Sequence, residues 1–494
     1  MTSAAAKTVS SKASVFGALD DAQMTAAHYL YWWLASGGTL LDGFSVVSLG
    51  VSLPLLERDF AIAPTMLGLI GSALVLGAVL GAALGGVLAD RIGRKRAFLA
   101  DMAILAAGSA LCVVATDPWV ILAGQFVIGV GIGIDFPTSG SYVAEITPKA
   151  ARSRMTVATI AMQSVGMIAA ALVGIAVLKF RPLTNDWRIL LGAGGVLAIL
   201  FMVARLRLPE SPRWLAEKGM IAEAAVVLSR LTGMPVSSAV LRAAVAIPTP
   251  SLPRARGTEG RGNGRKPTFA TLLDPRYRTR TLLVSLPWLM MDVATYGVGL
   301  FTPVILGAMH FGSSGGGAVA SDFANAKGSG LVDVFLLVGF IVGIWAVPRF
   351  GRIPMQVTGF AGMTLGMLTL MLATLADDGP QAHLYLIIGG FVLFNFAMNA
   401  GPNATTFTLA PVLFPTGIRA SASGFAAACA KIGATFGTFA VPEIRAAWGL
   451  VGVLALMAIV SVGGLVATAA FSHEVREEDE IEEEADEPQQ AIAV

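Results

Sequence analysis

The chain has 494 residues, of which 55% are hydrophobic and only 13% are charged, and its formal net charge is +2. Soluble domains carry about 25% charged residues, so this composition excludes a soluble enzyme, a nucleic-acid-binding protein and a disulfide-rich secreted domain. The two cysteines and four histidines are scattered along the chain, so we predict no metal site and no cofactor.

The apolar residues form blocks of roughly 20, the length that an α-helix needs to cross about 30 Å of hydrocarbon. These blocks are apolar all round, whereas membrane-barrel strands alternate over about ten residues, so helices are favoured. The block 383–412 is too long for one straight span, which predicts a bend near Gly401-Pro402. We predict an all-α membrane protein with twelve transmembrane helices at 30–55, 65–89, 98–115, 119–145, 155–178, 188–206, 281–307, 330–348, 356–376, 383–412, 420–441 and 449–471.

The segments outside the spans complete the predicted organisation. Loops rich in Lys and Arg mark the cytoplasmic side of a membrane protein, which places both termini in the cytoplasm. Within the linker, Ser211–Thr232 has helical character and 252–267 is expected to be flexible, while the acidic tail from Glu474 is expected to be disordered. We predict a cytoplasmic tail, a first six-helix bundle, a basic cytoplasmic linker with amphipathic helices, a second six-helix bundle and an acidic cytoplasmic tail, at 1–29, 30–206, 207–280, 281–471 and 472–494.

Basic loops with a common spacing occur in both halves. The segments Gly86–Arg94 and Arg349–Arg352 both place Arg-x-Gly-Arg after a predicted span. An acid near one helix end and an Arg from a neighbouring loop can latch one side of a carrier and separate when its halves rock. The alternative is that these arginines only anchor the topology. The predicted latch consists of Gly86, Asp90, Arg91, Gly93, Arg94, Glu145, Arg152, Arg349, Arg352 and Arg419.

These loops resemble those of the major facilitator superfamily, from about Leu30 to Phe471. The stretch Leu208–Trp214 also resembles the signature that follows the sixth helix in sugar porters. The resemblance implies the major facilitator fold, with two pseudo-symmetric six-helix bundles, and a secondary transporter rather than an enzyme. Pro348 and Val412 stand where the family often has acids, so we expect a carboxylate–arginine latch only in the first half.

Two acids of the first half lie within predicted spans, where a charge is costly and therefore a candidate for function. Asp42 lies in the first span, in Leu41-Asp42-Gly43. Asp135 lies in the fourth span after three glycines that allow a neighbouring helix to approach closely. Because burial disfavours the charged carboxylate, we expect Asp42 to carry a proton, with a structural hydrogen-bonding role as the alternative. We expect Asp135 to take part in proton coupling or to contact the substrate, with helix packing as the alternative.

The second half adds a further acid and a cation within predicted spans. Asp292 lies four residues from Trp288 and from Tyr296, which places the three side chains on one helical face and predicts the wall of a polar cavity. Lys431 lies in the eleventh span, where it needs a partner such as Asp292 or an anionic substrate. The alternative for this lysine is a purely structural ion pair.

Uncharged polar residues lie at similar depth. The amides of Gln163 and Asn399 are expected to bind polar cargo. Asn403, Thr405 and Thr406 are expected to satisfy backbone groups at the predicted bend.

Together these residues resemble the phosphate:proton symporter branch of the superfamily. Its fourth helix carries Asp-Tyr-Pro, matched here by Asp135–Pro137, and its tenth helix carries a run similar to Asn399–Phe407. Phe136 replaces the tyrosine of that motif, which weakens a phosphate site that depends on its hydroxyl group. The resemblance implies that Asp42, Asp135 and Asp292 handle protons. It implies an anion site formed by Gln163, Trp288, Asp292, Tyr296, Asn399 and Lys431, beside Phe136.

The sequence therefore predicts a proton-coupled symporter that works by alternating access in the cell membrane. Its predicted partners are a small-molecule solute, protons and the lipid bilayer; no nucleic acid is expected, and the chain is expected to be a monomer. Inorganic phosphate is the leading solute, a small organic anion follows closely, and a sugar or polyol is third. The alternative from another class is a membrane nutrient sensor that transports nothing.

Overall fold

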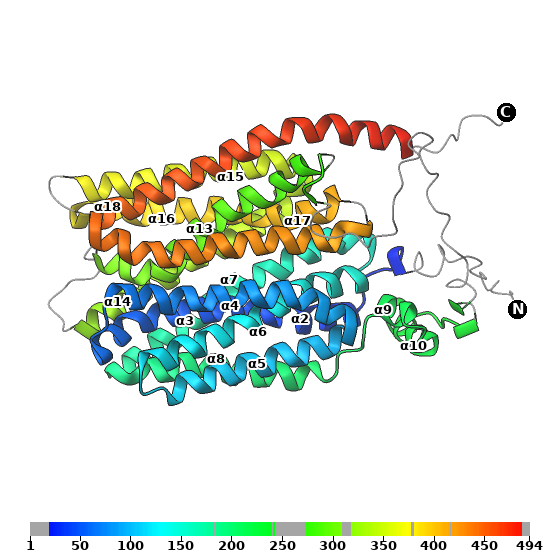
Figure 1. Cartoon of the computed structure of the whole chain (residues 1–494), viewed down its shortest axis with the longest axis horizontal. Coiled ribbons are helices and arrows are strands. Elements are labelled where there is room, and N and C mark those ends of the chain that lie inside the picture. Colours follow the sequence, from blue (N-terminus) through cyan, green and yellow to red (C-terminus); the bar gives the residue numbers. More distant parts are fainter. Residues whose placement is uncertain are drawn as a thin grey trace, which may run out of the picture.

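The computed structural model describes residues 19–180, 183–239, 241–242, 272–275, 277–308, 318–376, 380–414 and 416–486. Every regular element within these ranges is a helix, as the composition predicted. The long helices run side by side, with the blue-to-cyan helices of the first half on one side and the yellow-to-red helices of the second half on the other (Figure 1). The two halves meet where α4 packs on α18, α7 on α14 and α3 on α13.

The first half begins with two helices in one predicted span. Ser36 separates them, and its side chain returns a hydrogen bond of 2.8 Å to the carbonyl of Trp32. Gly93, at φ 96°, makes the turn between α4 and α5, in a conformation that disfavours any residue with a side chain. The helices are α2 (Ala26–Ala35), α3 (Gly37–Phe60), α4 (Pro64–Ile92), α5 (Arg94–Val114), α6 (Pro118–Ile146), α7 (Lys149–Phe180), η1 (Thr184–Asp186) and α8 (Trp187–Arg205).

The second half contains the bend predicted at Gly401-Pro402, which the structure confirms. One helix ends at Ala400 and the next begins at Pro402, because proline has no N–H to continue the helical ladder. The final helix contains a non-helical turn at Gly449, with φ 67°. The helices are α13 (Arg278–Ala308), α14 (Ala318–Phe350), α15 (Arg352–Leu375), η2 (Pro380–His383), α16 (Leu384–Ala400), α17 (Pro402–Leu413) and α18 (Thr416–Asp486).

The described residues contain ten helices that are long and apolar enough to cross a membrane. One of them, Ala422–Ser472, is 51 residues long and contains the turn at Gly449, so it supplies two spans. The helix Val334–Phe350 is shorter but also apolar. These segments correspond to the twelve predicted spans of an all-α membrane protein.

The polar segments are partly as predicted. The linker forms α9 (Pro212–Glu217) and α10 (Ile221–Thr232), which confirms the helical character of Ser211–Thr232. The predicted flexible stretch 252–267 lies outside the described residues. The disorder expected from Glu474 onward was wrong up to Asp486, because α18 continues to that residue and extends beyond the bundle (Figure 1). Glutamate is a strong helix former, which accounts for the continuation.

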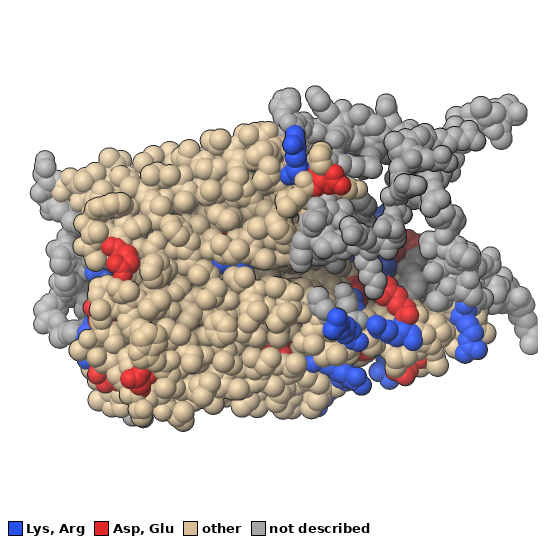
Figure 2. Space-filling model, viewed as in Figure 1, with Lys and Arg blue, Asp and Glu red and all other residues tan. Residues whose placement is uncertain are grey.

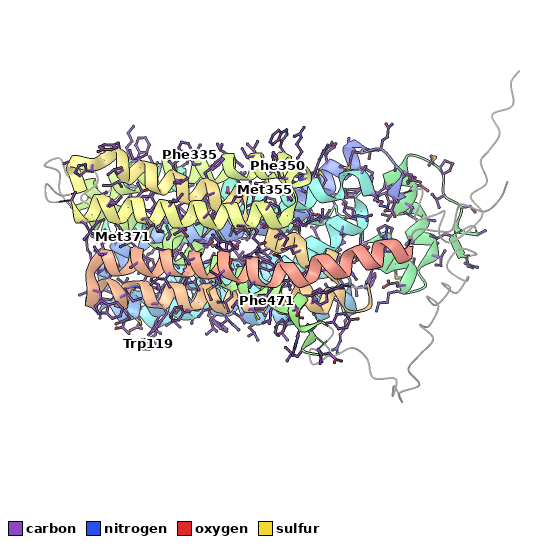
Figure 3. All side chains as sticks on the ribbon, turned by 90° about the horizontal axis from the view of Figure 1, so that it is seen from above. Trp119, Phe335, Phe350, Met355, Met371 and Phe471 are labelled. Carbon is purple, nitrogen blue, oxygen red and sulfur yellow. The ribbon has the colours of Figure 1, made fainter. Side chains whose placement is uncertain are left out.

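The surface separates into an apolar flank and a charged end. Figure 2 shows charged side chains gathered at the end that carries α9 and α10, whereas the long flank between the ends is almost free of charge. Figure 3 shows side chains projecting outward along the helices, with Trp119 and Phe350 at the edges of the view. These two side chains are 63% and 59% exposed, as expected of residues that face lipid.

Candidate functional site

Close packing of α3 against α7 positions the first acid. A Cβ at Gly43 would lie 1.9 Å from the carbonyl oxygen of Gln163, and one at Gly166 would lie 1.8 Å from that of Leu40. Only glycine allows two helix backbones to approach so closely. As a result, Gln163 Nε2 donates a hydrogen bond of 2.9 Å to Asp42 Oδ2.

Close helix packing at a glycine also positions the acid and the cation of the second half. A Cβ at Gly433 would lie 2.3 Å from the carbonyl oxygen of Leu289, so α18 packs directly on the backbone of α13. Lys431 Nζ consequently lies 3.4 Å from Asp292 Oδ2 and donates a hydrogen bond to Tyr296 Oη. The partner that the sequence predicted for the lysine is therefore beside it.

We expect Gly433→Ala to destabilise the protein by about 1–3 kcal/mol, because the added methyl group collides with a backbone atom that cannot rotate away. The matched control is Gly424→Ala in the same helix, where an added Cβ meets nothing within 4 Å. Thermal unfolding of the purified proteins measures the difference. Equal unfolding temperatures for the two variants would show that the α13–α18 contact is not tightly packed.

A hydrogen bond across the two halves joins these groups. Tyr296 Oη, on α13, donates to Asp42 Oδ2, on α3, over 3.1 Å while it accepts the proton of Lys431. All five side chains are at least 93% buried. They contain two carboxyl groups and one ammonium group, in a part of the molecule that is otherwise mostly apolar. This interbundle network consists of Asp42, Gln163, Asp292, Tyr296 and Lys431.

An aromatic cluster of Phe136, Trp288 and Phe407 adjoins the interbundle network. The ring of Phe407 lies edge-on to both others, with centroid distances of 6.4 Å to Phe136 and 6.0 Å to Trp288. Lys431 Nζ lies 4.8 Å from the ring centre of Phe136 and 4.2 Å from that of Tyr296. Both distances suit attraction between a cation and an aromatic face. The site thus offers a positive charge beside flat apolar surfaces.

Asp135 lies outside the interbundle network. Its Oδ1 accepts from Arg205 Nη2 over 2.8 Å, and the same guanidinium contacts Asp101 over 3.2 Å. The sequence reasoning missed Asp101 and Arg205. Both lie inside predicted spans, so the rule that charge within a span is a candidate for function could have identified them.

Asn399 is buried, and its side-chain amide forms hydrogen bonds with residues of α16 and α17 close to it in sequence. Its Nδ2 donates to the carbonyl of Asn395, and its Oδ1 accepts from Asn403 Nδ2 over 2.8 Å. Thr405 and Thr406 return hydrogen bonds to the carbonyls of Gly401 and Pro402, beside the bend. These contacts match the backbone role expected for the two threonines.

The basic end brings part of the predicted latch together. Arg94 Nη2, at the start of α5, lies 3.0 Å from Glu145 Oε1, near the end of α6. Glu210, which the sequence reasoning had not assigned, accepts the backbone N–H groups of Arg94 and Lys95 over 2.8 Å and 3.2 Å. This carboxylate therefore caps the N-terminus of α5, where the helix dipole favours a negative charge.

Other predicted latch residues contact different partners. Arg152 pairs with Asp20 and donates to the carbonyl of Thr147 over 3.2 Å. Arg349 stacks on the ring of Trp345 at 4.1 Å and, like Arg352, makes no ion pair with a described carboxylate. Gly86 lies opposite Pro137 and Arg91 is exposed. The side chains of Asp90 and Arg419 lie outside what the structure describes.

Most of the chain is similar in sequence to known transport proteins. The family described as "Sugar (and other) transporter" matches residues 2–484. The inner membrane metabolite transport protein YgcS of Escherichia coli is 27% identical over 463 residues, covering 93% of this chain and 94% of that protein. An Arabidopsis thaliana protein described as "Probable inorganic phosphate transporter 1-6" is 28% identical over 471 residues, covering 88% of this chain and 83% of that protein.

A solved structure confirms the predicted fold. The major facilitator superfamily proton:xylose symporter XylE, bound to 6-bromo-6-deoxy-D-glucose, superposes with a TM-score of 0.67 at 20% identity. The match covers 91% of this chain and 96% of that one. The likeness therefore extends over both halves of the molecule.

Proposed function

The chain belongs to the sugar (and other) transporter family, and from that premise we propose that it is a proton-coupled symporter for a small organic anion. As a family member it is a multi-pass membrane transporter and not an enzyme. The proposed solute and proton bind between the two helix halves, which rock about that site by alternating access.

The observation that carries the proposal is the interbundle network. It holds two carboxyl groups against one ammonium group, so in its ionised form it carries a net negative charge and repels an anion. Among the described residues, Asp42 accepts hydrogen bonds only from the neutral groups of Gln163 and Tyr296, whereas Asp292 is paired with Lys431. A proton on Asp42 neutralises the network, and an anion can then approach Lys431. Without that proton the loaded carrier would move a further negative charge through a closing apolar site, which is costly.

The aromatic cluster favours an organic anion. Phe136, Trp288 and Phe407 present apolar ring surfaces beside Lys431, and they match a solute with a carboxylate at one end and a flat apolar body at the other. Inorganic phosphate has no apolar part to fill such a cluster. An aromatic monocarboxylate suits both features.

Phosphate is the second candidate, since the motif residues around the network resemble those of phosphate:proton symporters. The similarity to the phosphate transporter of Arabidopsis thaliana supports this alternative. Phosphate led on the sequence alone, but it cannot fill the aromatic cluster, and Phe136 offers it no hydroxyl donor. For these two reasons together we rank phosphate second.

The proposal includes an orientation and a latch. The protein lies in the cell membrane, and the end that carries α9 and α10 faces the cytoplasm. Charged side chains gather at this end (Figure 2), and loops rich in Lys and Arg mark the cytoplasmic side of a membrane protein. Both termini lie on this side, and the carrier is a monomer. The ion pair of Arg94 with Glu145 joins the cytoplasmic ends of α5 and α6 within the first half, and we propose that it breaks when the transporter opens on that side.

Uptake by proteoliposomes under an imposed pH gradient tests the function. We expect the wild-type protein to accumulate benzoate, and we expect Phe136→Tyr to weaken benzoate uptake and to strengthen phosphate uptake, because the added hydroxyl is a donor near Lys431. Xylose serves as the neutral solute. Accumulation of phosphate without benzoate would show that phosphate, and not an organic anion, is the solute. Binding of benzoate without any accumulation would instead identify a sensor.

A further inference from the structure

The turn between α14 and α15 carries arginines for which the described residues supply no acid partner. Gly351 makes this turn at φ 87°, as Gly93 makes the turn between α4 and α5 at φ 96°. In the first half, the arginine after that glycine is Arg94, which pairs with Glu145 over 3.0 Å. Its counterpart in the second half is Arg352, whose Nε is buried and has no hydrogen-bond partner among the described groups.

The sequence of the surrounding helices explains why Arg352 has no such pair in the described part of the chain. Between Val334 and Leu413 the only acidic residues are Asp377 and Asp378, which follow α15 in the sequence, whereas the turn precedes it. The 24 residues of α15 separate its two ends by about 36 Å. An anion that meets Arg352 therefore has to come from outside these helices.

Arg349 extends the cationic turn to the lipid-facing surface. Its guanidinium carbon lies 4.1 Å from the ring centre of Trp345, and the ring of Phe350 lies 6.1 Å from that of Trp345. Both aromatic side chains are more than half exposed, and Figure 3 shows Phe350 at the edge of the view. Stacking on a ring uses only the face of the guanidinium, so its N–H donors remain available to a ligand.

An apolar strip leads from this turn along α14. It consists of Val338, Ile341 and Trp345, which are spaced three and four residues apart and therefore lie on one face of the helix. All three side chains are exposed. Arg349 follows four residues later on the same face. The strip offers an acyl chain a continuous apolar surface that ends at a cation.

We propose that the turn between α14 and α15 binds an anionic phospholipid, with the headgroup phosphate at Arg349 and Arg352 and an acyl chain along the apolar strip. An anionic headgroup brings the net negative charge that the turn lacks, whereas phosphatidylcholine carries a cation of its own. The planar fork of arginine suits phosphate because it can donate two parallel hydrogen bonds. The proposal goes beyond solute transport and requires only that the protein resides in a membrane.

Native mass spectrometry of the purified protein with phosphatidylglycerol and phosphatidylcholine tests the site. We expect the wild-type protein to bind phosphatidylglycerol in preference. We expect Arg349→Gln combined with Arg352→Gln to raise the dissociation constant of phosphatidylglycerol about tenfold, because two cations near the headgroup are lost. The control is Lys218→Gln combined with Arg230→Gln, which removes two charges from the linker helices and should leave lipid binding unchanged.

Equal binding of the two lipids by the wild-type protein would overturn the proposal, as would full affinity for phosphatidylglycerol in the double arginine variant. Inorganic phosphate should not displace the lipid at constant ionic strength, because it cannot occupy the apolar strip. Displacement would instead identify a site for free phosphate. Lipid binding that appears only once residues 474–494 are removed would show that the acidic tail occupies the turn, which also overturns the proposal.

Arg352→Lys is the second test if the double arginine variant does not fold. The charge remains but the planar fork is lost, so we expect the affinity for phosphatidylglycerol to fall about threefold. Unchanged affinity would contradict the contact with Arg352. These measurements involve no transported solute, so their outcome is independent of the uptake assay.

Discussion

Asp42→Asn is expected to abolish proton-driven accumulation while the protein still exchanges its solute. The asparagine oxygen can accept the hydrogen bonds of Gln163 and Tyr296, so the packing of α3 against α7 and α13 is retained. The amide cannot bind and release a proton at neutral pH. The loaded carrier can therefore still reorient, but the pH gradient no longer drives it.

Two measurements in proteoliposomes separate these effects. A gradient of one pH unit supplies about 1.4 kcal/mol, enough for about tenfold accumulation by the wild-type protein with one proton per solute. The variant should reach equal concentrations inside and outside, with counterflow exchange close to wild type. Asp59→Asn is the matched control in the same helix, where the acid accepts a hydrogen bond of 2.9 Å from Trp187 Nε1. Undiminished accumulation by Asp42→Asn would remove this acid from the coupling mechanism.

Lys431→Met is expected to weaken binding of the organic anion by about 100-fold. The change removes the only cation of the interbundle network, and with it the charge that Asp292 and Tyr296 contact. Truncating one partner of a buried charge pair costs about 2–5 kcal/mol in binding, and a 100-fold loss corresponds to about 2.7 kcal/mol.

Titration calorimetry with benzoate measures the affinity. Lys431→Arg should retain part of it, because the charge remains. Lys179→Met is the control for the same chemical change at an exposed lysine that lies over the ring of Phe180. Unchanged affinity in Lys431→Met would place the anion away from this lysine. A loss of proton coupling with full affinity would assign the lysine to the role proposed for Asp42.

The membrane helices and the bend were predictable because their causes are local. A run of apolar residues must be helical to satisfy its backbone in hydrocarbon, and Pro402 interrupts a helix wherever it lies. The pairing of Lys431 with Asp292 was predictable for a similar reason, since an isolated buried cation requires an acid. The acidic tail was misjudged because composition describes average disorder and not the continuation of a helix that has already begun.

Asp135 illustrates what sequence reasoning could not reach. Its depth in the fourth span suggested the same pocket as Asp42 and Asp292, but depth does not specify the direction in which a side chain points. Gly131 lets α6 approach α5, with an added Cβ only 2.7 Å from the carbonyl oxygen of Asp101. Asp135 consequently pairs with Arg205 inside the first half. The partner was decided by the packing of α5, α6 and α8.

By itself, the sequence determined that this protein lies in a membrane as twelve helices, and that a few charged groups are buried there. Those properties follow from the hydration cost of each residue, which does not depend on its neighbours. The tertiary structure alone decided which charges meet. Asp42 contacts Tyr296 across 254 positions of the chain, and only helix packing through small residues brings such distant groups within hydrogen-bonding distance.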